Sequence, residues 1–485
     1  MHIISCRSAL RSCAAALLLL ACLAGPALAY EALTGPTGVL KYVKGKAFEG
    51  YTLFSPMVKS TTTYLMDLEG NIVHTWQTKG VPGAHSVLLE NGNLLIAEAM
   101  EQKVNGFGGV GGAIREYDWD GHMVWEYVLS DNDHVQHHTF CRMPSGNTLI
   151  LAWERKSKSD ALAKGRDPKL IPDKPVTNSN IEHNDFWTDF VREVDRDGKT
   201  VWEWHTWDHI GKGPKALDIN YTLPKPVGDI YWSFDWSHYN TVGYNPASDQ
   251  VILNSRNFGE FYFINHKTGE IEYRWGNPSA YGGGRAPSWY DDGDQKMFGN
   301  HCATLTDKGT VLLFDNGSER PEGNRSRVIE VDPKTGAVVW EYAATDSTSF
   351  FSYRQGSVQK LPNGNVLVTS TNHGHIFEVT PDKKVVWEFV SPVFAGKLKC
   401  VAVEEEDTPR KNTVTNMIHR SYRYGPDFPG LAGRDLSVKG PLNPGCPTFY
   451  KAFVQGAGLA APAAAPAAAP AAPAPAEDGP SMKLY

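Results

Sequence analysis

The sequence predicts an all-β fold, a six-bladed β-propeller, and two repeated patterns carry that prediction. The first pattern is a short strand, a turn that usually contains Asp or Thr with Gly, and a second strand that ends in Trp. It occurs six times, in residues 64–76, 114–127, 191–204, 261–275, 328–342 and 376–389. Alternating β-branched and aromatic residues around such a turn are typical of a β-hairpin. Repeats of about 40–70 residues built from short strands indicate propeller blades rather than a helical solenoid.

One tryptophan recurs near the end of each hairpin. The recurring residues are Trp76, Trp125, Trp202, Trp275, Trp340 and Trp387. A large apolar side chain at one position of every repeat is what a core shared between neighbouring blades requires. We therefore expect these residues to pack blade against blade and not to take part in chemistry.

The second pattern is a strand that follows each Trp hairpin and opens with a histidine. His85, His138, His238 and His301 occupy this position, and a fifth copy has Gly356 there. The innermost strand of each blade lines the central channel of a propeller, so residues in one register converge at one end of it. The unusual polar content of these strands favours them as the innermost ones. A ring of histidines at the channel mouth is the expectation.

Other polar residues follow the apolar run of the same repeat, and we expect them at the far ends of the histidine strands. They are Glu98, Glu154, Arg256, Asp315, Asn316, Asn372 and His373. Several histidines show no register signal and are expected at the surface. They are His183, His205, His209, His266 and His419.

The chain is expected to divide into four parts. Residues 1–29 have a positively charged start, an apolar run and a small-x-small cleavage site, Ala27 to Ala29, which is typical of a signal peptide. Cleavage before Cys22, as in a bacterial lipoprotein, is the alternative. The propeller is expected over 35–395, a loop-rich extension over 396–455, and a disordered Ala/Pro-rich tail over 456–485. The stretches 154–185 and 277–299 are the longest insertions and should lie over one face of the propeller.

Cysteine usage and charge narrow the class of protein. Without the leader the cysteines are Cys141, Cys302, Cys400 and Cys446, and in an exported protein they predict at least one disulfide. Cys400 with Cys446 is the favoured pair, because both lie in the loop-rich extension. The net charge of −7 argues against a nucleic-acid partner. Outside the leader no run of about 18 apolar residues predicts a membrane span.

The strands that open with His238 and His301 carry the richest chemistry. Asn240 follows His238 by two positions, and Asn316 and Arg320 follow the strand of His301. Imidazole is suited to nucleophilic or acid–base work near neutral pH. Arginine presents a rigid fork of donors to tetrahedral oxyanions such as sulfate or phosphate. Together they indicate binding and transfer of an anionic group.

Five segments together resemble the bacterial periplasmic arylsulfate sulfotransferases. They read DWSHYN (235–240), GNHCATL (299–305), FDNG (314–317), RQGSVQKLPNGNVLV (354–368) and EVTPDKKVVWEF (378–389), and the resemblance covers roughly residues 35–395. It implies a six-bladed propeller that moves a sulfuryl group from an aryl sulfate to a phenol, with no nucleotide donor, cofactor or metal. The reaction would pass through a sulfated histidine in the periplasm. The family's N-terminal β-sandwich, used for dimerisation, has no counterpart between Tyr30 and the first hairpin, so the resemblance leaves the oligomeric state open.

The resemblance also implies roles for single residues. His238, His301 and Arg320 would hold the sulfuryl oxygens, and His373 would be the nucleophile, placed there by blade order. The remaining candidates would bind substrate; they are His85, His138, Arg256 and Asn316.

Other functions stay open at this level. A metal-dependent lactonase or esterase would need oxygen ligands around an ion, which Glu98, Glu154, Asn316 and Asn372 could supply, but it would leave the histidines unexplained. A quinone-dependent dehydrogenase propeller usually has eight blades. A propeller that binds a ligand without catalysis is the third class.

Overall fold

The fold was analysed in a computed structural model, which describes residues 35–57, 59–101, 107–109, 111–178, 181–222, 233–347, 349–400 and 416–446. The chain divides into two units, Met1–Glu31 and Ala32–Tyr485, and every described residue belongs to the second. The predicted signal peptide, the alternative lipidation site at Cys22 and the Ala/Pro-rich tail lie outside the described residues.

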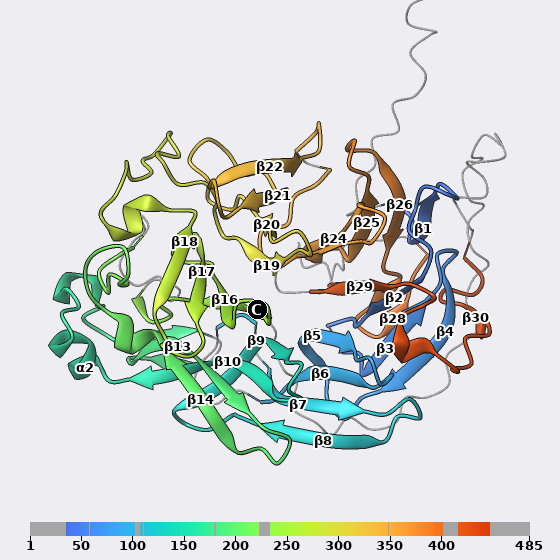
Figure 1. The fold of residues 1–485 in the computed structure, drawn as a ribbon, viewed down its shortest axis with the longest axis horizontal. Helices are drawn as coiled ribbons and strands as arrows, with labels where there is room; N and C mark the ends of the chain where they lie inside the picture. Colours follow the sequence, from blue (N-terminus) through green and yellow to red (C-terminus); the bar gives the residue numbers. More distant parts are fainter. Residues whose placement is uncertain are drawn as a thin grey trace, which may run out of the picture. The chain divides into compact units, whose positions relative to one another are not determined.

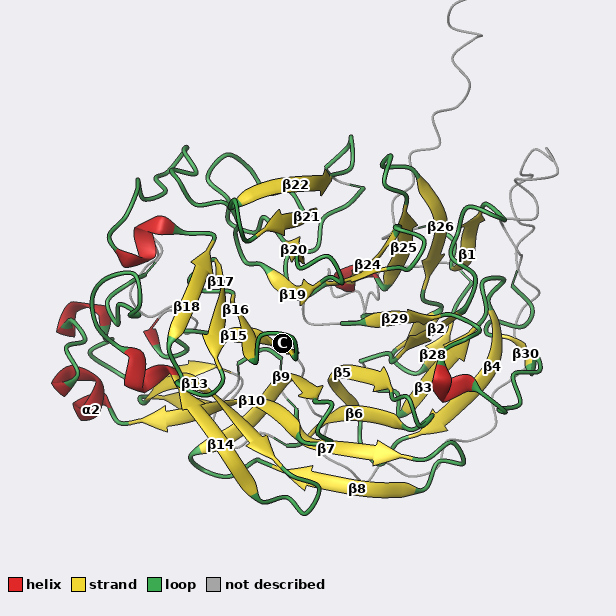
Figure 2. Ribbon diagram, in the orientation of Figure 1, coloured by secondary structure: helices red, strands yellow, loops and turns green. Residues whose placement is uncertain are grey.

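Six antiparallel sheets of four or five strands follow one another around a centre, as Figures 1 and 2 show. Each sheet is one blade, named here from the centre outwards. Blade 1 is β29 (Ser421–Tyr424), β2 (Tyr51–Phe54), β3 (Thr62–Met66), β4 (Asn71–Gln77) and the short β30 (Gly440–Pro441). Blade 2 is β5 (Pro82–Leu88), β6 (Leu94–Ala99), β7 (Gly112–Tyr117) and β8 (Met123–Val128). Blade 3 is β9 (His134–Arg142), β10 (Thr148–Lys156), β13 (Phe186–Val194) and β14 (Thr200–His205).

The second half of the ring repeats this plan. Blade 4 is β15 (Tyr239–Asn245), β16 (Gln250–Ser255), β17 (Glu260–Asn265) and β18 (Ile271–Trp275). Blade 5 is β19 (His301–Leu305), β20 (Val311–Asp315), β21 (Arg327–Asp332) and β22 (Ala337–Tyr342). Blade 6 is β23 (Ser357–Lys360), β24 (Val366–Ser370), β25 (His375–Val379), β26 (Val385–Val390) and β1 (Gly38–Tyr42). The prediction of a six-bladed all-β propeller is confirmed, and each predicted Trp hairpin forms the third and fourth strands of its blade, counted from the centre.

The ring is closed by strands from both ends of the described chain. β1 pairs with β26 on the outer edge of blade 6, and β29 pairs with β2 on the inner edge of blade 1. Residues 421–424 therefore complete a blade, although the sequence predicts the propeller to end at residue 395. The inner edge of β2 has backbone groups that require a hydrogen-bonding partner. In the other five blades the innermost strand comes before the hairpin in the chain, whereas in blade 1 it is β29, from the C-terminal extension.

Alternate residues of each middle strand face opposite neighbours, so every blade contributes to two cores. Leu94 and Ile96 of β6 pack toward blade 1, whereas Leu95 and Ala97 pack toward blade 3. The same division places one apolar cluster at each of the six junctions between blades. Because both faces of every sheet are covered, the middle strands read as nearly continuous apolar runs.

A tryptophan from each blade also donates a hydrogen bond to the outer turn of the next blade. The indole Nε1 of Trp76 donates to the carbonyl oxygen of Asp118 at 2.9 Å. The equivalent bonds run from Trp125 to Arg196, Trp204 to Gly269, Trp275 to Gly336, Trp340 to Pro381 and Trp387 to Leu68. The bonds pass once around the whole ring. All six tryptophans predicted to pack between blades do so, one at each junction, and in blade 3 the hydrogen bond comes from Trp204 instead of Trp202.

One of the two long insertions follows β10, the second strand of blade 3, and the other follows β18, the last strand of blade 4. After β10 come α2 (Lys158–Ala163), η1 (Pro168–Leu170), β11 (Val176–Asn178) and β12 (Ile181–His183). The other short elements are η2 (Thr206–His209), η3 (Pro278–Tyr281), η4 (Thr371–His373), β27 (Val393–Phe394), β28 (Lys397–Leu398) and η5 (Pro429–Leu431). β10 ends, and β19 begins, on the side where the histidines lie, so both long insertions border that side.

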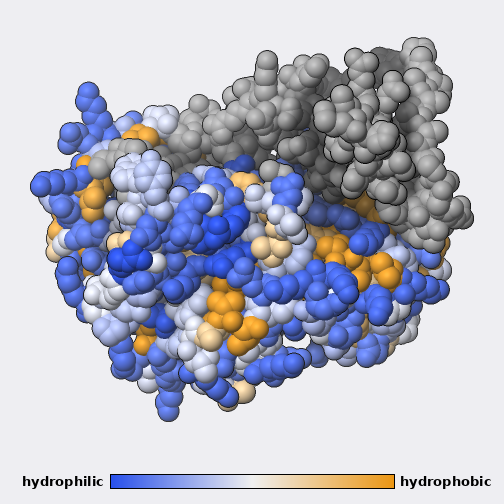
Figure 3. Space-filling model, turned by 90° about the horizontal axis from the view of Figure 1, so that it is seen from above, coloured by the Kyte–Doolittle hydropathy of each residue, from blue (hydrophilic) through white to orange (hydrophobic). Residues whose placement is uncertain are grey.

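Cys400 and Cys446 form the disulfide that the sequence favours, while Cys141 and Cys302 are free thiols. The bond joins the end of blade 6 to the segment that carries β29. No helix in the described part of the chain has the length and apolar character needed to cross a membrane. The face drawn in Figure 3 is mostly hydrophilic with small separate apolar patches.

Candidate functional site

The histidine register coincides with a β-bulge in four innermost strands. Strand pairing slips near His85 in β5, opposite His138 in β9, just after His238 in β15 and just after His301 in β19. Left-handed backbone accompanies three of these bulges, with φ of 50° at His138, 41° at His238 and 56° at Cys302. Such a conformation costs roughly 1–3 kcal/mol at a non-glycine residue. A bulge redirects a side chain, so the repeated strain is part of how the histidines are positioned.

The bulges bring four imidazole rings together at the centre of the ring. His138 lies 5.0 Å from His238, 6.3 Å from His301 and 6.1 Å from His419, measured between ring centroids. His301 and His419 are 6.2 Å apart. All four side chains are buried, and we call them the histidine cluster. The convergence predicted for His138, His238 and His301 therefore occurs, and a further histidine joins it.

His301 has its proton fixed by its neighbours. Its Nδ1 lies 2.7 Å from Oδ1 of Asn316 and 2.8 Å from the carbonyl oxygen of Gly299. The amide nitrogen of Asn316 donates to two backbone carbonyls, so its oxygen is the acceptor and Nδ1 of His301 carries the hydrogen. Nε2 then has the lone pair and accepts the backbone N–H of Gln355 at 3.2 Å. Burial, with Asn316 opposing it and Arg256 nearby adding to it, lowers the pKa of His301 to about 3.

His238 is oriented by a carboxylate. Its Nδ1 is hydrogen-bonded to Asp235, and the other oxygen of Asp235 accepts Nε1–H of Trp153 at 3.1 Å. Asp235 is fully buried, and its hydrogen bond fixes the orientation of the imidazole ring. A histidine held in this way can accept and return a proton, as a base with an orienting group does in other enzymes.

His138 is linked to a second buried carboxylate through its chain neighbour. Nδ1 of His138 lies 2.8 Å from Nδ1 of His137, and Nε2 of His137 lies 2.9 Å from Asp189. Burial, then the neighbouring charge of His238, holds the pKa of His138 well below its usual range. The ring is further confined by Gly109, where a Cβ would lie about 2.0 Å from Cε1 of His138.

The fourth member, His419, corrects the prediction that it lies at the surface. It is 1% exposed and directly precedes Arg420, just before β29, so it occupies the histidine register in blade 1. Neither ring nitrogen has a hydrogen-bond partner among the described residues. The sequence signal was hidden because no turn and apolar strand follow His419, unlike the other copies. His183 is also buried, at 2% exposure, again contrary to the prediction.

His85 occupies the register in blade 2 but lies beside the cluster. Its Nε2 shares a hydrogen bond of 2.9 Å with the hydroxyl of Tyr422, and its ring contacts Phe140. In blade 6 the register position is Gly356, where a Cβ would meet the ring of Phe314 at 3.0 Å. Packing against Phe314 therefore excludes a histidine at the register position of blade 6.

The residues predicted at the far ends of the histidine strands lie instead at the same end as the histidines. They terminate the second strand of each blade, and an antiparallel second strand returns to where the first began. Arg256 follows β16 in this way; its backbone N–H donates to the carbonyl of His238, and its charge contributes to the low pKa of His301. Arg256 and Asn316 therefore border the cluster.

Two other predicted residues are placed differently from the expectation. Arg320 is held by Asp315, at 2.6 Å, and by Asp292, and its guanidinium lies over Phe298. Two carboxylates thus already neutralise it, which makes it a structural cation beside the site. His373, in η4, takes no part in the ring contacts of the cluster, and burial lowers its pKa to about 4.

The carboxylates that a metal-dependent hydrolase would need are bound to cations. Glu98 pairs with Arg115 and accepts the Tyr117 hydroxyl, and Glu154 pairs with Lys156 and His205. These pairs sit in blades 2 and 3 and leave no converging set of oxygen ligands among the described residues at the histidine cluster.

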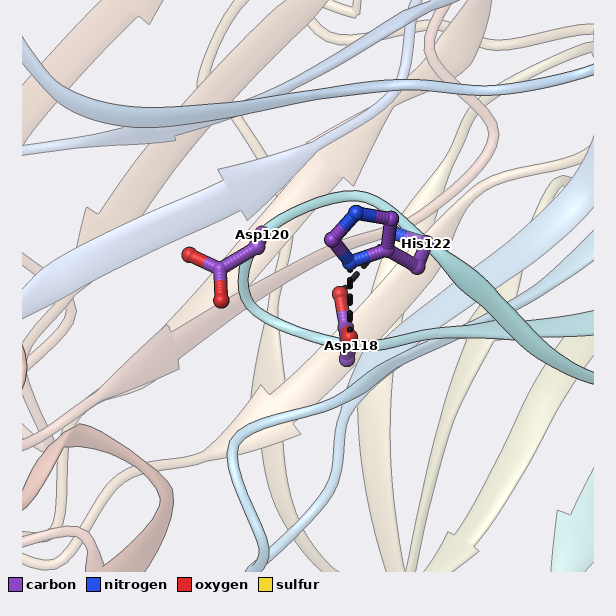
Figure 4. A group of neighbouring side chains, drawn as sticks. All are labelled: Asp118, Asp120 and His122. Atoms are coloured by element: carbon purple, nitrogen blue, oxygen red, sulfur yellow. Dashed lines mark hydrogen bonds and ion pairs between the residues drawn. The ribbon is translucent and has the colours of Figure 1, made fainter.

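A possible ligand group does occur in the β7–β8 turn, where Asp118, Asp120 and His122 lie close together (Figure 4). The carboxylate of Asp118 accepts the backbone N–H of His122 at 2.8 Å and also contacts its ring. Asp67, Asp195 and Asp332 accept backbone N–H groups in the same way in other blades. The motif therefore belongs to the turn of the repeat, and nothing else at this position points to a bound ion.

Comparison with known proteins adds the family. The profile described as Arylsulfotransferase (ASST) matches residues 39–416. Arylsulfate sulfotransferase AssT of Escherichia coli O6:H1 is 25% identical over 246 residues, covering 39% of this chain and 40% of the relative. Arylsulfate sulfotransferase AssT of Lelliottia amnigena is 25% identical over 177 residues, covering 30% and 29%. The alignments thus span well under half the length of these curated relatives.

Solved structures resemble the chain only distantly. A protein of unknown function from Bacteroides caccae has a TM-score of 0.43 and 11% identity, covering 73% of this chain and 97% of its own. A streptogramin B lyase has a TM-score of 0.38 and 12% identity, covering 80% and 94%. TM-scores and identities this low give no information about function.

Proposed function

The chain belongs to the arylsulfotransferase family, and on that premise we propose that it transfers a sulfuryl group from an aryl sulfate to a phenol without a nucleotide donor. The observation that carries the proposal is the histidine cluster, whose members come from four different blades and meet at the centre of the ring. An imidazole with a free lone pair, such as that of His301, can accept a sulfuryl group, whereas carboxylates already paired with cations cannot. The Cys400–Cys446 disulfide supports an oxidising compartment, and we place the protein in the periplasm.

His301 is the nucleophile in this proposal, in place of His373. Its Nε2 has the lone pair, which leaves the hydrogen bond from the backbone N–H of Gln355 when it attacks, and its low pKa keeps the ring unprotonated at neutral pH. The lone pair forms an N–S bond while the S–O bond to the aryl group breaks and its electrons leave with the phenolate. The sulfated ring retains the Nδ1 hydrogen and gains positive charge. Asn316 Oδ1 and the Gly299 carbonyl accept hydrogen bonds from this Nδ1–H and so stabilise the positive charge.

His238 moves the proton. Held by Asp235, it protonates the leaving phenolate in the first half-reaction and takes the proton of the incoming phenol in the second. The phenol oxygen then attacks sulfur, the N–S bond breaks, and His301 regains its lone pair. His138 and Arg256, with Asn316, border the transferred group, while Arg320 acts by holding the loop after β20 in place.

A direct assay tests the proposal. The purified full-length chain is mixed with para-nitrophenyl sulfate, with and without a second phenol, and nitrophenol release is followed by absorbance. We expect release that depends on the second phenol, and sulfur label from the donor on a histidine peptide containing residue 301. Release at equal rates without phenol would indicate a sulfatase, and label on no histidine during active transfer would exclude the covalent route.

A further inference from the structure

We propose that Arg420, which directly precedes the strand that closes the ring, binds the negative charge of the sulfate group at the histidine cluster. The inference rests on the proposed function for its substrate class, a sulfate monoester or sulfate itself. It adds a residue from the C-terminal segment, outside the 35–395 range that the sequence assigns to the propeller.

The side chain of Arg420 crosses the central channel. β29 belongs to blade 1, and the Nη2 atom of Arg420 donates to the hydroxyl of Thr241 at 3.1 Å and to the carbonyl of Asn240 at 3.4 Å. Both acceptors lie in β15 of blade 4, which stands opposite blade 1 in a ring of six. The Nη1 atom donates to the hydroxyl of Tyr422 at 3.3 Å. The guanidinium therefore lies between opposite blades, within a few residues of His238 along β15.

The charge of Arg420 has no carboxylate partner. Arg420 is 5% exposed, and none of the ion pairs among the described residues includes it. Its nearest ionisable neighbours are Cys302 and Tyr422 together with the neutral histidines. Four other buried arginines are each paired with a carboxylate: Arg115 with Glu98, Arg274 with Glu260, Arg320 with Asp315 and Arg423 with Glu378.

A buried cation of this kind is costly unless an anion meets it. Among the described residues, the Nε atom of Arg420 has no hydrogen-bond partner, and both nitrogens of His419 beside it have none either. The positive charge of Arg420 also lowers the pKa values of His419 and His85, after the larger effect of burial. Unused donors, uncompensated charge and adjacent histidines fit a tetrahedral dianion or monoanion better than a neutral ligand.

The cation reaches this position only because the C-terminal segment forms the inner strand of blade 1. β29 pairs with β2 over Tyr51–Phe54, and Cys446 of the following segment is bonded to Cys400. The pairing of β29 with β2 therefore closes the ring and brings Arg420 to the histidine cluster at the same time.

Binding of inorganic sulfate, measured by calorimetry on the full oxidised chain, tests the inference separately from catalysis. We expect Arg420→Met to weaken sulfate binding by roughly 10-fold or more, since one hydrogen bond to a charged group is removed. Arg420→Lys should lose less, because the charge stays. Arg423→Lys, in the adjoining strand β29, is the matched control: it keeps the pair with Glu378, so its sulfate affinity should equal that of the wild type.

The outcomes separate the two proposals. Sulfate affinity unchanged in folded Arg420→Met would overturn the inference, whatever the activity. Sulfate binding that depends on Arg420 in a protein without phenol-dependent transfer would support the inference and refute the proposed function. If Arg420→Met and Arg423→Lys weaken binding equally, Arg420 has only a structural effect and the inference fails.

Discussion

The outer hairpins and the inner ends of the blades are both repeated six times, but they differ in whether their polar groups have hydrogen-bond partners. In the outer turns each indole N–H has a carbonyl acceptor on the next blade, and each turn aspartate accepts backbone N–H groups. At the inner ends the repeat places histidines on strained, bulged backbone, with ring nitrogens and a guanidinium nitrogen left without protein partners.

The difference separates stability from function. A repeated contact that only holds blades together satisfies its polar groups locally, since each unpaired buried group costs free energy. Unpaired ring nitrogens in the histidine cluster, beside a buried arginine that lacks a carboxylate partner among the described residues, are tolerated where a bound ligand supplies the missing hydrogen bonds and charge. Arg420, just before β29, and Arg423, within it, show the contrast, because among the described residues only the second has a carboxylate partner.

The largest effect should come from removing the nucleophile. His301→Ala is expected to lower turnover with an aryl sulfate on the order of 10⁴-fold, because the covalent step is lost. His373→Ala, the nucleophile predicted from sequence, should change it less than about tenfold. Steady-state kinetics on both folded variants measures this. The reverse order of effects would return the nucleophile to η4.

Stability should distinguish Arg420, just before β29, from Arg423, within β29. Arg423→Met leaves Glu378 buried without its cation and should lower the free energy of unfolding by about 3–5 kcal/mol. Arg420→Met removes a charge that has no carboxylate partner and should be neutral or stabilising. Denaturant unfolding in sulfate-free buffer compares them. Equal destabilisation would mean that Arg420 is compensated in the free protein.

Breaking the disulfide should loosen the closing strand by a smaller amount. Cys400→Ser with Cys446→Ser is expected to lower the free energy of unfolding by about 2–4 kcal/mol, since the bond constrains a long loop in the unfolded chain. Thermal unfolding with and without reductant checks this on the wild type. Cys302→Ser is the control, because Cys302 is a free thiol and reductant should not act through it.

Acid should destabilise the inner ends in particular. The pKa of His301 is about 3 in the folded protein and near 6.5 in the unfolded chain, so the unfolded state binds the extra proton between these values. Stability contributed by the neutral ring is present above pH 6.5 and is lost as the pH falls toward 3. Between pH 7 and pH 5 His301→Gln should lose roughly 2 kcal/mol less than the wild type. Parallel pH profiles would mean that His301 does not remain neutral.

The outer turns should respond least. Asp118→Ala removes hydrogen bonds to His122 in an exposed turn and should cost only about 0.5–1.5 kcal/mol, with sulfate binding and turnover unchanged. Chelating agents should likewise leave activity unaffected if this loop holds no functional ion. A loss of activity in either experiment would give the loop a role that its resemblance to the other turns does not predict.

Most of the architecture could be predicted from the sequence, because its signals are local. The turn of each hairpin, the alternation of each strand and the register of His85, His138, His238 and His301 are written within short segments, and hydrogen-bonded neighbours in a blade are also neighbours in the chain. The position of Cys400 and Cys446 in one loop-rich stretch likewise favoured the pair that forms.

Only the tertiary structure decided how the site is completed. His419 and Arg420 enter it because the inner strand of blade 1 comes from the far end of the chain, more than 350 residues from its partner β2, and such long-range pairing leaves no local pattern. Charge pairing was equally invisible: Arg320 and Arg420 are the same residue type, but Asp315 and Asp292 neutralise only the first. Residue types and spacing determined where histidines gather, whereas the contacts across the channel decided which charges remain available to a substrate.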